Sequence, residues 1–323
     1  MDWKRCLQEL HIPFEEHVDL KKRTWIHRGG TAHFYVMPES VEQLSELVRR
    51  LYAQKALFTL VGHTSNLYIR NSTNLGIVIS TIHLTQVREE NGIYICDCGV
   101  AIAPLARQAI AKGQVGYEGL VNLPGTVGSA AVNNAGCFQC SISDLLIEAE
   151  VLFEDGQIRT ISKEQFDYSE RSSAFKRGDQ QGVLLRVKLA CDRLGDKESL
   201  LQKAEANTLY RKTRQEGPKQ NLGSTFPIYV MEAFYRHLPP HTKLCLIVSA
   251  KLHQIVGKKR SQKSVNAIIL STNGLYCRLH RYISQHNFGC FVWRDAGADK
   301  AFITYRSFVA KTAGMTDIEI EVL

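Results

Sequence analysis

Apolar and polar positions in the front half of the chain change repeatedly between helical and strand spacing. In residues 38–56 the apolar side chains recur at helical spacing, and Ser40 is placed to cap the predicted helix. Short apolar stretches on either side read as strands, at residues 33–37, 57–61, 76–79 and 93–98. Such alternation predicts an α+β or α/β fold.

The pattern continues through the rest of the chain. We expect a helix at 100–112 with Pro104 in its first turn, and then strands at 148–153, 158–161 and 183–190. Asp155-Gly156 is a hairpin signal between the first two of these strands. Further helices are expected at 197–212 and 298–313, and a strand at 317–323. Two segments, 243–256 and 265–270, read as strands or as a strand and a helix, and the apolar run 244–249 reads as a buried strand.

Composition narrows the class of protein. The chain has 323 residues, 44% hydrophobic and 22% charged, which suits a soluble globular protein of about two domains. We place the boundary at 195/196, where the sequence turns polar. No apolar run reaches the roughly 18 residues of a membrane span, and the first residues lack the apolar core of a signal peptide. The nine scattered cysteines indicate reduced thiols in a cytoplasmic protein, and no Cys–His block indicates a metal site.

Charge leaves several classes of partner open. The formal net charge is +8, with one basic cluster at Lys258, Lys259, Arg260 and Lys263 and another at Arg211, Lys212 and Arg214. Nucleic-acid binding, a pocket for a diphosphate-bearing ligand and a solvated helix face all fit such clusters.

Two glycine-bearing turns carry the candidate chemistry. Residues 60–66, LVGHTSN, directly follow an apolar strand, and residues 123–130 read LPGTVGSA. Glycine lets backbone N–H groups approach an anion closely, and the Thr, Ser and Asn side chains add hydrogen-bonding groups. Neither turn matches a P-loop or a dinucleotide-binding fingerprint, so each alone fits a tight structural turn equally well.

Together these turns resemble a known family. The segments TWIHRGGTA (24–32), VGHTSNLYIR (61–70) and GYEGLVNLPGTVGSAAVNNAG (116–136) are similar to those of the UDP-N-acetylenolpyruvoylglucosamine reductase family. The resemblance implies an α+β architecture: an FAD-binding domain of the vanillyl-alcohol-oxidase type at 1–195, with two subdomains divided near 80–90, and a smaller α/β substrate-binding domain at 196–323. It assigns FAD to Gly62, His63, Thr64, Ser65, Asn66, Pro124, Gly125, Thr126, Gly128, Ser129 and Asn134. His63 stands where the family usually has glycine; we expect it to contact phosphate or solvent rather than to attach FAD covalently.

The resemblance extends to RSSAFK (171–176), RKTRQEGPKQNLGSTF (211–226) and IEIEV (318–322). It implies that NADPH reduces FAD and that the flavin then reduces an enolpyruvyl group. Arg171 would stabilise the enolate-like charge, Ser224 would protonate the α-carbon, and Glu321 would be the acidic partner. On the residues alone, these three fit a surface ion pair, a turn serine and an exposed strand residue.

Departures from the family fall mainly after residue 226, and residues 273–300 have no recognised counterpart. The leading hypothesis is the family reaction on its enolpyruvyl nucleotide sugar. A second is a divergent paralogue acting on another nucleotide sugar or a small acid, and a nucleic-acid-binding protein ranks last. We therefore expect a cytoplasmic monomer or weak dimer with a small-molecule partner, and neither a nucleic-acid nor a membrane partner.

Overall fold

The computed structural model describes residues 1–216, 220–257 and 259–323. Residues 217–219, within the expected loop at 215–223, and Lys258 of the basic cluster lie outside the described residues. The chain divides into two compact units, whose main division falls at 209/210 inside helix α6 (Lys197–Arg214), not at 195/196. Unit 1 comprises Met1–Thr24, Gly29–Ser65 and Asn71–Leu209, and unit 2 comprises Trp25–Arg28, Asn66–Arg70 and Tyr210–Leu323.

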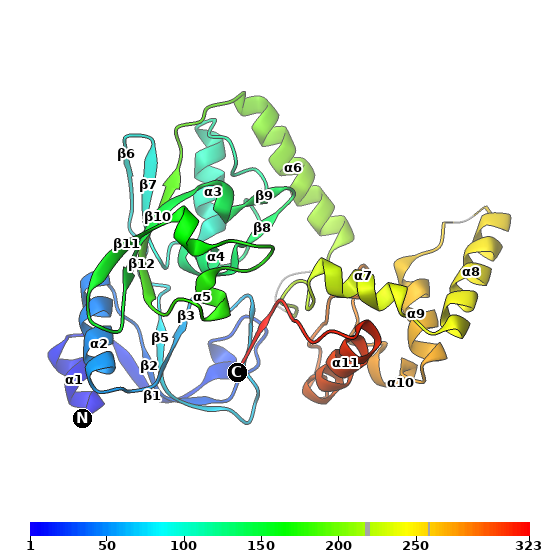
Figure 1. Cartoon of the computed structure of the whole chain (residues 1–323), viewed down its shortest axis with the longest axis horizontal. Helices are drawn as coiled ribbons and strands as arrows, with labels where there is room; N and C mark the ends of the chain where they lie inside the picture. Colours follow the sequence, from blue (N-terminus) through cyan, green and yellow to red (C-terminus); the bar gives the residue numbers. More distant parts are fainter. Residues whose placement is uncertain (217–219, 258) are drawn as a thin grey trace. The chain divides into compact units, whose positions relative to one another are not determined.

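Unit 1 contains a four-stranded sheet of order β1-β2-β5-β3 (Figure 1). Its strands are β1 (Phe14–Asp19), β2 (Thr31–Val36), β5 (Asn74–Ser80) and β3 (Phe58–Val61). β1 pairs antiparallel with β2, whereas β2, β5 and β3 are parallel. Helix α2 (Val41–Ala53) connects β2 to β3, and the Ser40 side chain accepts a hydrogen bond from the Gln43 N–H, which confirms the predicted cap.

The second sheet of unit 1 is antiparallel, with order β11-β10-β12-β7-β6. Its strands are β11 (Ile158–Ser162), β10 (Leu146–Leu152), β12 (Val183–Ala190), β7 (Ile93–Asp97) and β6 (Val87–Glu90). The hairpin predicted at Asp155-Gly156 joins β10 to β11. The smaller elements of the unit are α1 (Trp3–Glu9), α3 (Ile102–Ala111), α4 (Val127–Asn133), α5 (Ala174–Arg177), β8 (Gly136–Cys137), β9 (Cys140–Ser141) and 3-10 turns at Leu20–Lys22, Ile142–Asp144 and Lys163–Phe166.

Helix α2 is the centre of one core of unit 1. Leu44, Leu47, Val48 and Leu51 are completely buried, and each such side chain contributes about 1.5–3 kcal/mol through removal from water. They pack together with apolar residues of β2, β5 and β12. A second core lies between α3, α4 and the five-stranded sheet. Leu123, Val127 and Ala130 of the second candidate turn belong to this second core, so the packing holds both ends of that turn in place.

Unit 2 is built mainly of helices around an aromatic core. Phe234 stacks on Phe288 with ring centroids 5.2 Å apart, and Phe291 lies between Trp293 and Tyr305. The segment 273–300, which has no recognised counterpart, therefore supplies much of this core. The elements are β4 (Leu67–Tyr68), paired parallel with β13 (Glu321–Val322), and α7 (Ile228–Arg236), α8 (Pro240–Ile255), α9 (Gln262–Thr272), α10 (Tyr276–Leu279) and α11 (Ala298–Ala313).

In unit 2, the strand expected at 243–256 is wrong, whereas at 265–270 the helical one of the two expected alternatives is present. Residues 243–256 and 265–270 lie in helices α8 and α9, and the supposed buried strand 244–249 is part of α8, where Leu244 is 61% exposed. A short apolar run does not distinguish a strand from a helix, and Pro240 at the first helical position favours the helix. Of the last strand expected at 317–323, only Glu321–Val322 pairs.

Candidate functional site

The first glycine turn lies at the carboxyl end of β3. Val61 pairs with Ser80, the last residue of β5, so two parallel strands end side by side at this turn. Ligands of open sheets with parallel strands bind beyond such carboxyl ends. Thr64, in the middle of the turn, is buried and has a left-handed backbone with φ 54°.

The two glycine turns contact each other directly within unit 1. A Cβ added at Gly62 would lie 2.8 Å from Thr126 Oγ1, and a Cβ at Gly125 would lie 3.3 Å from Ser65 Oγ. Gly125 also has φ 126°, a conformation that side chains other than glycine rarely adopt. The packing of one turn against the other therefore requires glycine at position 62, and the positive φ, together with the nearby Ser65, favours glycine at position 125.

The second turn leads into α4 through a reciprocal cap. Thr126 Oγ1 accepts a hydrogen bond from the Ser129 N–H, and Ser129 Oγ accepts one from the Thr126 N–H at 3.1 Å. Gly128 lies against Cys98, because an added Cβ would be 2.8 Å from Cys98 Cβ. Pro124, near the start of the turn, is exposed. The Thr126 and Ser129 side chains thus shape the turn.

Two buried polar atoms of unit 1, one at the end of α4 and one at the end of β5, lack a hydrogen-bond partner. One is the Oδ1 of Asn134, the left-handed residue that ends α4; the other is the Oγ of Ser80 at the end of β5. Since buried polar atoms are nearly always hydrogen-bonded, such atoms indicate a missing ligand or water. Asn134 was among the predicted residues. Ser80 was missed, because a serine at the end of an apolar strand gives no signal beyond strand termination.

Arg171 lies in a loop that is fastened to α4 and the residues after it. Tyr168 Oη donates to the Ala131 carbonyl at 2.9 Å, and Ser173 Oγ donates to the Val132 carbonyl at 2.6 Å. Asn134 Nδ2 donates to the Ser169 carbonyl at 2.8 Å. These bonds hold the Arg171 loop against the C-terminal half of α4, the helix that the second turn leads into. Sequence reasoning missed them, because long-range bonds to backbone carbonyls leave no periodic pattern.

The other predicted residues belong to unit 2 and are connected there. Asn66 donates from Nδ2 to the Glu319 carbonyl at 3.2 Å, and its own carbonyl accepts from the Glu321 N–H at 2.9 Å. The Glu319 N–H donates to the carbonyl of Thr225, the residue after Ser224. Asn66, Ser224 and the C-terminal strand are therefore gathered in one part of unit 2, where Ser224 is half-buried and Glu321 is exposed.

The surroundings of His63 favour the neutral form of its side chain. Burial lowers the pKa of His63 below its ordinary value of 6.5, and a hydrogen bond with the Gly125 backbone opposes this shift in part. A neutral imidazole can contact the second turn without bringing a buried positive charge into the site.

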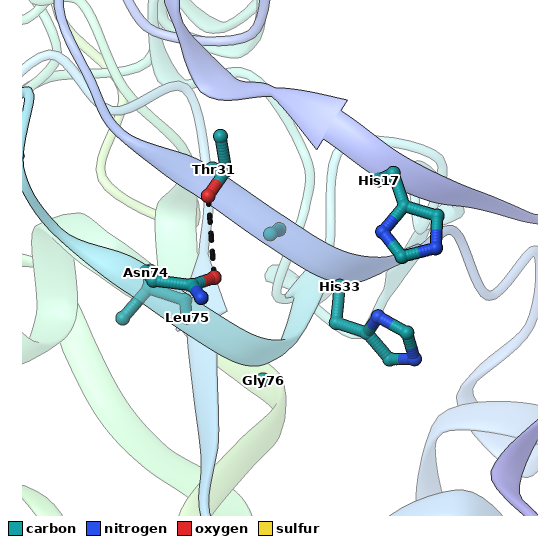
Figure 2. Close-up of a pocket in the computed structure, with 7 residues that line it drawn as sticks. His17, Thr31, His33, Asn74, Leu75 and Gly76 are labelled. Atoms are coloured by element: carbon teal, nitrogen blue, oxygen red, sulfur yellow. Dashed lines mark hydrogen bonds between the residues drawn. The ribbon is translucent and has the colours of Figure 1, made fainter.

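A separate pocket of about 520 Å³ opens on the strands β1, β2 and β5. His17 and His33 lie on one side of it, with ring centroids 4.7 Å apart, and Thr31 hydrogen-bonds to Asn74 on the other side (Figure 2). None of its lining residues is a predicted site residue.

The residues around the two turns fit a flavin dinucleotide. Two adjoining turns of small residues leave backbone groups accessible, as a pyrophosphate requires. The unsatisfied Oδ1 of Asn134 is an acceptor, and an isoalloxazine ring carries an N–H that such an acceptor can bind. Within the described residues, no group of three or more His, Cys, Asp or Glu side chains is arranged to hold a metal ion.

Comparison with known proteins agrees with this geometry. Residues 32–162 match the model of the FAD binding domain family. UDP-N-acetylenolpyruvoylglucosamine reductase 2 of Bacillus cereus is 31% identical over 220 residues, which cover 68% of this chain and 70% of that protein. The reductase of Bacillus subtilis is 31% identical over 252 residues, covering 77% of this chain and 80% of that protein.

The fold is also that of a solved structure. UDP-N-acetylenolpyruvylglucosamine reductase (MurB) from Thermus caldophilus superposes with a TM-score of 0.65 at 22% identity. The match covers 96% of this chain and 99% of that one. The chain belongs to the UDP-N-acetylenolpyruvoylglucosamine reductase family of FAD-binding oxidoreductases.

Proposed function

We propose that this chain uses NADPH to reduce UDP-N-acetylglucosamine enolpyruvate to UDP-N-acetylmuramate, a step of peptidoglycan precursor synthesis in the cytoplasm. Membership of the reductase family supports the reaction. The observation that carries the proposal is the direct packing of the Gly62 turn on the Gly125 turn. The unsatisfied Asn134 Oδ1, at the other end of α4, is a further acceptor in the same unit.

The flavin would be held by the residues of the two turns in unit 1. Backbone groups of Gly62–Ser65 face the pyrophosphate in this proposal, and Thr126 and Ser129 keep the second turn in shape through their cap. When bound, FAD supplies hydride chemistry, taking a hydride from NADPH and delivering it to the β-carbon of the enolpyruvyl group.

Three side chains complete the reaction in this proposal. Arg171, permanently charged, stabilises the negative charge that develops on the enolate and its carboxylate. Ser224 Oγ gives its proton to the α-carbon, and a basic carbanionic centre is strong enough to take it. Glu321 is the acidic partner beside the enolate. The backbone bonds that connect Thr225, Glu319 and Asn66 support a fixed position for Ser224.

Replacement of the proton donor separates the two half-reactions. In Ser224→Ala, we expect flavin reduction by NADPH at the wild-type rate and loss of at least about 100-fold in oxidation of the reduced flavin by the enolpyruvyl sugar. Ser271→Ala, an exposed serine of α9, is the matched control and keeps both rates. Stopped-flow absorbance measures each half-reaction. Normal turnover by Ser224→Ala would disprove the assignment of the proton donor.

A divergent paralogue is the second candidate. The changes after residue 226 favour it, since Ser264 and Ile320 replace a histidine and a proline of the family pattern. A yellow protein that oxidises NADPH but ignores the enolpyruvyl sugar would support this alternative. Efficient turnover of that sugar would eliminate it.

A further inference from the structure

One part of unit 2 is basic throughout. Residues 233–294 contain no Asp or Glu, whereas lysine and arginine recur along the whole segment. This segment includes α8, α9 and α10. Its described lysines, which are Lys243, Lys251, Lys259 and Lys263, are all exposed. The surface that these helices present to solvent therefore has no negative side chain to balance its positive charge.

Helix α8 also exposes a row of aliphatic side chains. Leu244 is 61% exposed, Val248 47% and Ile255 80%, and their spacing of four and seven residues places them on one face of the helix. Ile247 and Leu252 flank this face and are also more than half exposed. We call these five residues the α8 apolar face. Single exposed aliphatic residues are ordinary, but a contiguous row on one helix is not.

The opposite side of α8 already has its packing partner. Helix α8 lies beside α9 (Figure 1). Leu246 packs against the core of unit 2, and Thr242 is completely buried and hydrogen-bonded to Thr272 of α9. Arg260 donates to the Leu246 carbonyl at 2.6 Å. The helix is therefore anchored to unit 2 by its inner side, and the α8 apolar face is not needed for that core.

We propose that α8 binds the surface of an anionic phospholipid bilayer. The α8 apolar face enters the boundary between headgroups and acyl chains, while Lys251, Lys259 and Lys263 contact lipid phosphates. Lys251 lies seven residues after Leu244, on the same face, so its aliphatic stem lies along the bilayer surface and its ammonium group reaches the headgroups.

Charge and chemistry argue for a bilayer over two other partners. A second copy docked through the same face would bring two acid-free basic surfaces together, and their repulsion opposes such a dimer. Nucleic acid would satisfy the lysines but would leave five aliphatic side chains against phosphates. The bilayer accommodates both the lysines and the aliphatic side chains.

This inference departs from the expectation that the protein has no membrane partner, and it is independent of the proposed reaction. In the described part of the chain, no helix is long and apolar enough to cross a membrane, so the contact is peripheral.

Vesicle flotation tests the proposal on the full-length protein. We expect flotation with vesicles of phosphatidylcholine and phosphatidylglycerol at low salt, little with phosphatidylcholine alone, and a decrease with added salt. The triple variant Leu244→Ser/Val248→Ser/Ile255→Ser should partition at least about tenfold more weakly. Ile303→Ser, which removes a 63% exposed isoleucine from α11, is the matched control and should float like the wild type.

A second variant separates the charge from the apolar contact. Lys251→Gln/Lys259→Gln/Lys263→Gln should lose the preference for phosphatidylglycerol. Far-UV circular dichroism and the unfolding midpoint confirm that each variant is folded. Absence of flotation by the wild-type protein, or equal flotation by the triple serine variant, would overturn the proposal. So would a lipid-free dimer that the triple serine variant abolishes, because the second copy would then be the partner.

Discussion

Gly62→Ala tests the packing of the two turns. The added methyl group would lie 2.8 Å from Thr126 Oγ1 and 3.1 Å from its Cγ2, whereas carbon contacts are most favourable at about 3.5–4 Å. Thr126 is only 1% exposed, and its hydroxyl caps α4, so it has little room to move away. Such overpacking costs about 1–3 kcal/mol, and partial loss of the cap adds about 0.5–2 kcal/mol.

The two turns can relieve this contact by moving apart, and FAD would then have to bring them together again. We therefore expect Gly62→Ala to weaken FAD binding by roughly 5-fold to 150-fold, the change that corresponds to the 1–3 kcal/mol of overpacking. The assay is the quenching of FAD fluorescence during titration of the apoprotein. Gly76→Ala is the matched control, because Gly76 lies in β5 of the same unit with a negative φ and nothing within 4 Å of the added Cβ. Unchanged affinity in Gly62→Ala, or an equal loss in Gly76→Ala, would refute the reasoning.

Other predictions concern the same site. Asn134→Gly keeps the left-handed backbone but removes the unsatisfied amide oxygen, so FAD affinity should fall about tenfold. The free energy of unfolding should also fall by about 1 kcal/mol, because the hydrogen bond to the Ser169 carbonyl is lost. Unchanged affinity in the fluorescence titration would contradict this prediction. Thr126→Val keeps the side-chain shape but removes the cap of α4, so the free energy of unfolding in urea should fall by about 0.5–2 kcal/mol. An unchanged free energy of unfolding would contradict this prediction. Because the pKa of His63 is lowered in the folded protein, its contribution is complete above about pH 6.5 and is lost as the pH falls toward the lowered value. His63→Gln should therefore flatten the unfolding midpoint between pH 7 and about pH 5, and an unaltered slope would show that another group is responsible.

The front half of the fold could be predicted because its local patterns and its packing agree. The apolar stripe of α2, the Ser40 cap and the Asp155-Gly156 turn each specify one local structure, and all three are present. The helix α8 could not be predicted, since the run 244–249 is too short for a period to be read and most of its apolar residues face solvent.

The candidate site was predicted as residue types and not as contacts. The motifs brought Gly62 and Gly125 to attention, but only the structure gives the reason for these glycines, which is the opposing turn at each position. The bonds from Tyr168 and Ser173 to α4 join residues about 40 positions apart. Such long-range contacts depend on the tertiary fold and leave no trace in local sequence spacing.

The most direct test of the central claim is the visible absorption spectrum of the purified protein, together with FAD titration of any apoprotein. The two packed turns predict one FAD per chain, with the absorption bands of an oxidised flavin and loss of those bands on addition of NADPH. A colourless protein that neither quenches FAD fluorescence nor changes its unfolding midpoint with added FAD would contradict the account.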